Sequence, residues 1–554
     1  MSDMMFGQVR VVREDKGLGY IEAENGDTIF FFLTAVQHNI IPPIGCEVQF
    51  FLKQAKKGPM ATSITVLPPR KEPRKPNYTQ EGFDALRQIA DWKLDAKFDN
   101  NLRYFFVIPE IEAIENADKC YVIGRKGTGK TAISEYLSNK SSHDIFSCKL
   151  SFKNFPFNDL YALEDNSYTH PNTYITLWKY IIYSSIARLM ILNQNIDSTI
   201  RSKLESIYSP DIGSSLPKNI TRWTTRNIGF SVLATGVSIG HSTTTRPSDA
   251  SWTDRIDVLE QLISTYLDES KYFVLFDELD EDYREVQDKE ATTRYTSLLI
   301  GLFKAAQDIR SKFTRNNTGI LPVIFLRDDI YALLMDSDKT KWSDFSINLS
   351  WDVNKIKLLL AFRISRAFNA TSPPLEFDAA WKTIVSPRYI GIRSKRDSFD
   401  FVALHTLSRP RDYIQYLKSA ATIAMTNELS IIDAPSLAHA SHDYSSYLRS
   451  EFIDELYPII PEISSVLDVL AQIGKQTFTT RDFSKAYLQS VRINQLPKRD
   501  PLELLEILFD FSVLGYVVPG SNRRIFKNNE PKAIFNPAYS VIIQYGLFNA
   551  FLLI

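Results

Sequence analysis

Cysteine is scarce in this chain of 554 residues, which contains only Cys46, Cys120 and Cys148. Three scattered cysteines provide neither a disulfide framework nor the spacing of a zinc site, and such usage is typical of the reducing cytosol. The seven histidines show no metal-ligand spacing either. We therefore expect a cytoplasmic protein without disulfides or a structural zinc ion.

A large net charge and a long apolar run are missing as well. Because the net charge is −1, any surface for nucleic acid has to be a local patch. No apolar run reaches the roughly 18 residues of a membrane span, and the N-terminus lacks the basic-then-apolar layout of a signal peptide. We expect no contact with a membrane. The chain is too long for one hydrophobic core, so several domains are expected.

The most informative segment that is present fits the pattern G-x-x-x-x-G-K-[ST]. Apolar residues 120–123 precede it and predict a strand, and residues 132–137 follow it and predict a helix. In this context backbone N–H groups and the helix N-terminus bind phosphates, whereas a surface turn rich in glycine and lysine is the structural alternative. The residues of the predicted nucleotide-binding loop are Gly124, Arg125, Lys126, Gly127, Thr128, Gly129, Lys130 and Thr131.

Lys130 and Thr131 have separate predicted roles in this loop. We expect Lys130 to reach the β- and γ-phosphates of ATP and the Thr131 hydroxyl to hold Mg²⁺. Further along, apolar residues 271–276 predict a buried strand that ends in Asp277 and Glu278. We interpret these acids as the second half of an ATPase site, in which Asp277 lies beside Mg²⁺ and Glu278 orients or deprotonates the attacking water.

A third buried strand is predicted at residues 321–326, and Arg327 follows it directly. Ligands of open α/β sheets bind at the carboxyl ends of the strands. We therefore expect Arg327 to lie near the γ-phosphate and to take part in catalysis or sensing. An ion pair with a neighbouring acid is the alternative interpretation.

Residues 6–67 alternate apolar and polar positions over short stretches separated by turn signals, which predicts an all-β OB barrel. This region resembles the cold-shock domain family along almost its whole length. In that family, aromatic side chains stack on the bases of single-stranded nucleic acid, so the resemblance implies single-stranded DNA or RNA as a partner. The matching segments are Gly7–Arg10, Lys16–Ile21, Ile29–Val36, Gly45–Val48 and Lys57–Ala61.

The barrel departs from the family at two aromatic positions, which are Val11 and Leu18 here. Because stacking contributes about 1–3 kcal/mol per base, the loss of two rings weakens the expected binding. A barrel that is kept for docking a partner protein is the alternative. The candidate residues for stacking and for phosphate contacts are Tyr20, Phe30, Phe32, Arg10, Lys16 and Lys57.

The sequence predicts five consecutive regions. Long helical patterns that alternate with apolar runs after the barrel indicate an α/β ATPase core with a parallel sheet. The stretch between the two ATPase motifs is unusually long and contains an aromatic helix around Trp178 and a β-like segment at 230–233; insertions of this kind often carry partner contacts. The regions are an OB barrel (1–67), a proline-rich basic linker (68–77), the P-loop core (78–350), a helical lid (351–448) and a winged-helix-like α+β domain (449–554).

Residues 407–413 open a predicted helix that has a proline suited to its first turn. The segment resembles the nucleotide-sensing region of STAND and origin-recognition-type P-loop ATPases, although the glycine of that family is Ser408 here. The resemblance implies that Arg409, Pro410 and Arg411 bind the nucleotide. Ordinary ion pairs at the start of a helix are the alternative.

After Ser450, three predicted helices (462–473, 480–490 and 502–514) and a β-hairpin follow in winged-helix order. The third helix is acidic and apolar, which disfavours contact with phosphates. We therefore expect packing or self-association rather than DNA reading. The apolar tail at 547–554 is expected to dock on the body of the protein.

Together these features predict an ATP-binding and ATP-hydrolysing switch with Mg²⁺ as its cofactor. The domain combination resembles ATPases of bacterial antiviral defence systems, which implies a homo-oligomer and an effector partner protein. The alternative is a scaffold that holds ATP without turning it over and docks a partner through the barrel. A helicase is disfavoured because the sequence has no second motor core.

Overall fold

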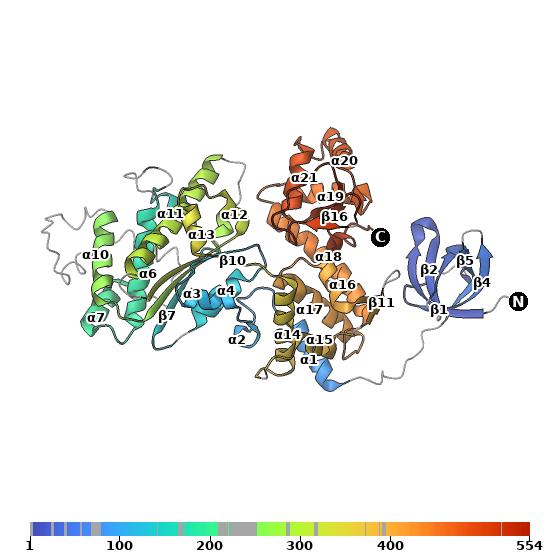
Figure 1. Ribbon diagram of the computed structural model, residues 1–554, viewed down its shortest axis with the longest axis horizontal. Helices are drawn as coiled ribbons and strands as arrows, with labels where there is room; N and C mark the ends of the chain where they lie inside the picture. Colours follow the sequence, from blue (N-terminus) through green and yellow to red (C-terminus); the bar gives the residue numbers. More distant parts are fainter. Residues whose placement is uncertain are drawn as a thin grey trace.

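The computed structural model contains an N-terminal barrel, an α/β unit, a helical unit and a C-terminal unit of helices and a small sheet (Figure 1). The predicted multidomain architecture is thereby confirmed. The whole of the predicted linker at 68–77 and the β-like segment at 230–233 lie outside the described residues. The structure describes residues 4–23, 27–37, 41–55, 58–67, 79–140, 142–153, 155–163, 169, 172–208, 220, 252–283, 289–314, 319–371, 373–386, 388–390, 395–521 and 523–553.

The barrel forms because apolar residues alternate along its strands and point inward. Val9, Ile21, Phe31 and Val48 are completely buried in its interior. The strands close in the order β1-β2-β3-β5-β4, as the OB prediction requires. The prediction of a barrel is confirmed. Its strands are β1 (Met4–Arg13), β2 (Leu18–Ala23), β3 (Thr28–Phe32), β4 (Glu47–Ala55) and β5 (Gly58–Val66).

The α/β unit is built on a parallel sheet whose central strands β8 and β9 are buried on both faces, which explains their nearly continuous apolar sequences. The strand order is β10-β6-β9-β8-β7, so that β9 separates the strand before the phosphate loop from the strand before the acids. All neighbours are parallel, and these two functional ends therefore lie at the same edge. The strands are β6 (Tyr121–Ile123), β7 (Ile145–Ser151), β8 (Lys271–Asp277), β9 (Gly319–Leu326) and β10 (Ser346–Asn348).

The aromatic helix that we expected in a partner-binding insertion is a core element. Trp178 on this helix is completely buried, and its Nε1 donates a hydrogen bond to the Leu298 carbonyl at 2.8 Å. The helix, α6, is long and apolar enough to cross a membrane, but 72% of it is buried inside the protein. The helices of the unit are α2 (Asn101–Tyr104), α3 (Pro109–Glu115), α4 (Lys130–Asn139), α5 (Phe157–Tyr161), α6 (Ile175–Leu192), α7 (Ser198–Tyr208), α10 (Trp252–Tyr266), α11 (Lys289–Thr314), α12 (Asp328–Leu333) and α13 (Lys339–Asp344).

The helical unit includes one helix from far upstream. Helix α1 packs against α14, α15 and α17 (Figure 1), although the sequence placed it in the core region 78–350. The reason is its apolar face, since Leu86 and Ile89 are completely buried among lid residues. The elements are α1 (Gln80–Ala90), α14 (Val353–Phe368), α15 (Phe377–Ile384), β11 (Arg388–Ile390), β12 (Lys395–Asp397), α16 (Ser398–His405), α17 (Pro410–Thr426) and α18 (Ala434–Leu456).

The C-terminal unit follows the predicted order of helices and strands, with one difference in length. The third helix, α21, ends at Asp510 instead of reaching Leu514. Ser512 adopts a left-handed φ of 63°, which ends the helix, and Leu514 begins β14. The elements are α19 (Ile463–Ile473), β13 (Thr477–Phe478), α20 (Thr480–Arg492), α21 (Pro501–Asp510), β14 (Leu514–Val517), β15 (Arg524–Phe526) and β16 (Ser540–Ile543).

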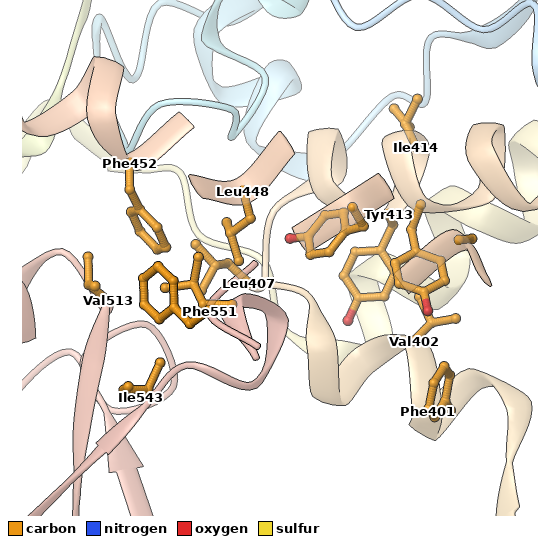
Figure 2. Close-up of a cluster of buried hydrophobic side chains, with 14 of the residues drawn as sticks. Phe401, Val402, Leu407, Tyr413, Ile414, Leu448, Phe452, Val513, Ile543 and Phe551 are labelled. Atoms are coloured by element: carbon orange, nitrogen blue, oxygen red, sulfur yellow. The ribbon is translucent and has the colours of Figure 1, made fainter. Parts of the chain in front are cut away.

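Helix α18 runs through the boundary that the sequence predicts at residue 448, so the lid and the C-terminal unit are continuous. Leu448 and Phe452 of this helix face Leu407, Val513 and Phe551 in one apolar cluster (Figure 2). The tail is part of this cluster, which confirms that it docks on the body. The change of pattern after Ser450 predicted a boundary, but the buried side of the helix continues through it, with Ser445, Leu448 and Phe452 all buried.

We expect the change Trp178→Ala to destabilise the α/β unit by about 3–5 kcal/mol, because it leaves a cavity beside Phe152 and Phe276. Trp178→Phe, which keeps most of the ring volume, should cost less. Calorimetric unfolding of the full chain measures both changes. An unaltered transition for Trp178→Ala would contradict a core role and favour a partner surface.

Candidate functional site

The loop between β6 and α4 has the backbone shape of a phosphate cradle. Gly127 and Gly129 have φ values of 82° and 101°, which residues other than glycine rarely adopt. A Cβ at Gly127 would come within 3.3 Å of the Arg411 Cβ. Helix α4 begins immediately after, at Lys130, so its free N–H groups point toward the loop.

The Lys130 ammonium lies inside this loop. It donates hydrogen bonds to the carbonyl oxygens of Gly124 at 2.8 Å and Arg125 at 3.0 Å. Burial lowers the pKa of Lys130, and the nearby charges of Asp280 and Asp277 act in the opposite direction. The cation therefore lies within electrostatic reach of the acids that follow β8.

Asp277 ends β8 in a buried position, with 2% of its surface exposed. Its Oδ2 lies 2.9 Å from Lys149 Nζ on the neighbouring strand β7. Burial raises the pKa of Asp277, while Lys149 works to lower it. The charge of the Asp277 carboxylate is thus compensated by a cation on the adjacent strand, and no sequence motif points to this lysine.

Glu278 follows with a left-handed φ of 61°, which is uncommon for a residue other than glycine and is concentrated at functional sites. This turn directs the side chain away from the strand. Its two carboxylate oxygens accept hydrogen bonds from Lys97 Nζ at 2.8 and 2.7 Å, and one of them also contacts the Ser151 hydroxyl. The sequence did not predict Lys97 or Ser151 as site residues.

A cavity of 520 Å³ adjoins the loop, within the size range of sites for small molecules and cofactors. It brings together the predicted residues from Lys126 to Thr131, Glu278, Pro410 and Arg411. Apolar side chains also line this cavity, and the sequence did not predict them because they come from separate helices and loops. These apolar lining residues are Phe105, Phe106, Ile108, Leu359 and Ile414.

A second cavity of 680 Å³ lies beside the same loop and reaches the C-terminal unit. It is lined by Gly124 and Arg125 of the loop and by Arg327 and Arg409. The structure therefore distributes the predicted site residues over two adjoining cavities. The smaller one is lined by Lys130 and Glu278, for which the sequence predicts contact with the phosphates and with the attacking water.

Arg327 is 8% exposed and forms two hydrogen bonds with Asp329, at 3.0 and 2.7 Å. Its Nη1 lies 3.7 Å from Asp280. Burial works to lower the pKa of Arg327, but Asp329 and Asp280 raise it overall. The ion pair that we kept as the alternative is present, and a role in sensing the γ-phosphate stays a prediction.

Arg409 joins three elements at a buried position. Its guanidinium pairs with Asp412 on α17 at 2.9 Å and with Glu455 on α18 at 2.6 Å, and it donates to the Lys126 carbonyl of the phosphate loop at 3.2 Å. Burial works to lower its pKa, but the two acids raise it well above the usual value. Arg411 is more exposed and lies 3.4 Å from Glu451.

Arg125 links the phosphate loop to the C-terminal unit. Its Nη2 donates to the Asp510 carbonyl at 2.8 Å, and its Nη1 donates to the Ser512 hydroxyl at 3.2 Å. Its Nε also lies 3.5 Å from Asp328. The side chain of this loop residue therefore points away from the cavity that contains Lys130.

The candidate metal residues are suited to Mg²⁺ rather than to a structural metal. In the part of the chain that the structure describes, no group of three or more histidine, cysteine or acidic residues could hold a metal ion. Mg²⁺ is usually held by one or two carboxylates together with the phosphates of a nucleotide. The Asp277 carboxylate at the end of β8 and the Thr131 hydroxyl in the first turn of α4 are donors of this kind.

The barrel carries the predicted aromatic residues on two neighbouring strands. The Tyr20 and Phe30 rings are 5.7 Å apart, and those of Phe30 and Phe32 are 4.9 Å apart, in edge-to-face arrangements. Phe32 is 47% exposed. Arg10 is paired with Glu22 at 2.7 Å, and Lys16 is exposed. Lys57 lies outside the described residues.

The N-terminal region was compared with known proteins, and it matches the cold shock protein CspD of Bacillus subtilis. The two are 33% identical over 66 residues, which are 12% of this chain and 100% of the relative. The N-terminal domain belongs to the cold-shock family. The cold-shock domain was therefore identified correctly from its sequence segments.

Outside the cold-shock domain, the matches are more distant. Residues 354–453 match the family model of the FunZ-associated C-terminal helical domain. The transposon gamma-delta 80.3 kDa protein of Escherichia coli (strain K12) is 24% identical over 429 residues, which cover 73% of this chain and 57% of that relative. The ORC2 protein of Aeropyrum pernix, in ADPNP and ADP complexes, is similar at 12% identity and a TM-score of 0.38, over 82% of this chain and 95% of that one.

Arg409→Ala is expected to destabilise the protein by about 3–5 kcal/mol, because it leaves Asp412 and Glu455 buried without their cation. Arg411→Ala, which removes a more exposed ion pair of the same helix, should cost under about 1 kcal/mol. Thermal unfolding of both variants measures the difference. Equal melting temperatures would show that Arg409 does not hold the loop, the lid and α18 together.

Proposed function

We propose that this chain binds ATP with Mg²⁺ in the 520 Å³ cavity and hydrolyses it as a switch. One observation carries the proposal: Lys130, Thr131 and Glu278 meet at this cavity although they follow different strands. The polar lining residues suit the phosphates, and the apolar lining residues, such as Phe106, suit the base.

The site residues would have different roles in phosphoryl transfer. Lys130 and the loop amides would neutralise the phosphates, and Thr131 and Asp277 would hold Mg²⁺, which supplies further charge to the phosphate oxygens. Glu278 would accept a proton from the attacking water. Most of the rate acceleration in such a site comes from position and charge, which is why these groups are set on a rigid sheet edge.

The lid would respond to the nucleotide. Leu359 of α14 and Pro410, Arg411 and Ile414 of α17 line the cavity together with the phosphate loop. A nucleotide between these elements would draw the lid toward the sheet, and α18 would carry the motion into the C-terminal unit. We include in the proposal that this unit is a winged-helix module used for packing or self-association.

The cold-shock domain would bind single-stranded DNA or RNA through Tyr20, Phe30 and Phe32. Two observations support this binding: the domain belongs to the cold-shock family, and the three rings lie close together on neighbouring strands of the barrel. Roles in a homo-oligomer, with an effector partner and in antiviral defence belong to the same proposal. They rest on the combination of domains alone.

A second candidate function is a scaffold that retains ATP without hydrolysis. The observation that favours it is the engagement of both Glu278 oxygens by Lys97. A carboxylate in such a pair is a poor acceptor for the proton of water. Turnover and retention of the nucleotide separate the two functions.

We expect Lys130→Ala to abolish the stabilisation of the protein by ATP and Mg²⁺, because the main cation for the phosphates is removed. Lys140→Ala, which changes a residue at the other end of α4 that is paired with Glu115, should leave this stabilisation intact.

Glu278→Gln should keep ATP binding and lower turnover by about 10²-fold or more. Thermal shift and phosphate release measure these effects, and tight retention with no release from the wild-type chain would favour the scaffold.

Changing Tyr20, Phe30 or Phe32 to alanine should weaken binding of single-stranded oligonucleotides by about 1–3 kcal/mol for each stacked base. Phe6→Ala, which removes an exposed ring from β1, is the matched control. Titration of labelled DNA and RNA strands across a salt series measures the change. A salt dependence without any loss in the aromatic variants would mean electrostatic attraction alone and would favour docking of a partner protein.

A further inference from the structure

The segment between α1 and α2, residues 91–100, is attached to the lid. Asp99 of this segment pairs with Arg363 of α14 at 2.9 Å. The Arg363 guanidinium is buried between the rings of Trp92 and Tyr104, at 4.7 and 4.9 Å from their centres. Because α1 also packs on α14 and α17, this segment has to move when the lid moves.

Lys97 extends from this lid segment to the sheet. Its ammonium lies 2.7 Å from one Glu278 oxygen and 2.8 Å from the other, at the edge where β8 ends. The two side chains are 25% and 20% exposed, so water screens the pair only in part. This ion pair therefore connects the lid to the carboxylate that borders the nucleotide cavity.

The pair has a direct chemical consequence for Glu278. Both of its oxygens accept from the same ammonium, and Ser151 occupies a further acceptor position on one of them. A general base needs a free lone pair directed at the proton it removes. The γ-phosphate of ATP is a stronger concentration of negative charge and competes for the same lysine, whereas ADP has no group at that position.

We propose that Lys97 is a positioning residue that restrains Glu278 until the γ-phosphate draws the ammonium away. The proposal rests on the ATP hydrolysis proposed above. After release, Glu278 takes a proton from the attacking water as the water oxygen bonds to the γ-phosphorus. The bond from that phosphorus to the bridging oxygen breaks, and its electron pair remains on ADP. Lys97, on the segment attached to the lid, thus keeps Glu278 inactive until ATP is bound.

Single-turnover hydrolysis of ATP by excess full-length protein tests the restraint. Lys97→Met should raise the rate by about tenfold, which corresponds to about 1.4 kcal/mol in the barrier, and Lys97→Arg, which keeps the charge, should remain near the wild-type rate. Lys355→Met is the matched control, because Lys355 of α14 pairs with Glu110 of α3 and so also joins the lid to the α/β unit, but away from Glu278. Glu278→Gln should abolish the gain of Lys97→Met.

An equal or lower rate for Lys97→Met overturns the proposal, and so does an equal gain in Lys355→Met, which would indicate general loosening of the lid. Affinities for ATP and ADP with Mg²⁺ give a second readout. Glu278→Gln should tighten ATP binding several-fold but not ADP binding, and only while Lys97 is present. Failure of every variant and of the wild-type chain to bind ATP would instead contradict the proposed function itself.

Discussion

The arrangement of the nucleotide site depends on a guanidinium that is removed from water. Arg409 satisfies acids from two helices and a carbonyl of the phosphate loop at once. A buried charge of this kind is stable only when its partners stay in place. The loop, α17 and α18 are therefore held as one assembly, and the cavity beside them has a defined shape.

Much of the architecture could be predicted because its signals are local. The phosphate loop, the strand before Asp277 and the alternation in the barrel each occupy a few consecutive residues. The boundary predicted at residue 448 is wrong because the buried face of α18, which includes polar residues such as Ser445, continues to Leu456. Similarly, α1 was assigned to the α/β core because of its place in the chain, whereas its apolar face packs against the helices of the lid.

The site was predictable only in part, for the same physical reason. Glycines and Lys130 are required by the local turn, but Lys149 and Lys97 become partners of the acids through folding. Lys97 is 181 positions from Glu278, and nothing in the sequence around either residue indicates the contact. The apolar residues that line the cavity are likewise brought together from separate helices and loops.

The Arg125 side chain connects the phosphate loop directly to the C-terminal unit. Arg125 binds the carbonyl at the end of α21 and the serine whose left-handed backbone leads into β14. Any tightening of the cradle around a ligand pulls on this tether. Through Arg125, a change in the shape of this loop can thereby reach β14 and the rest of the C-terminal unit.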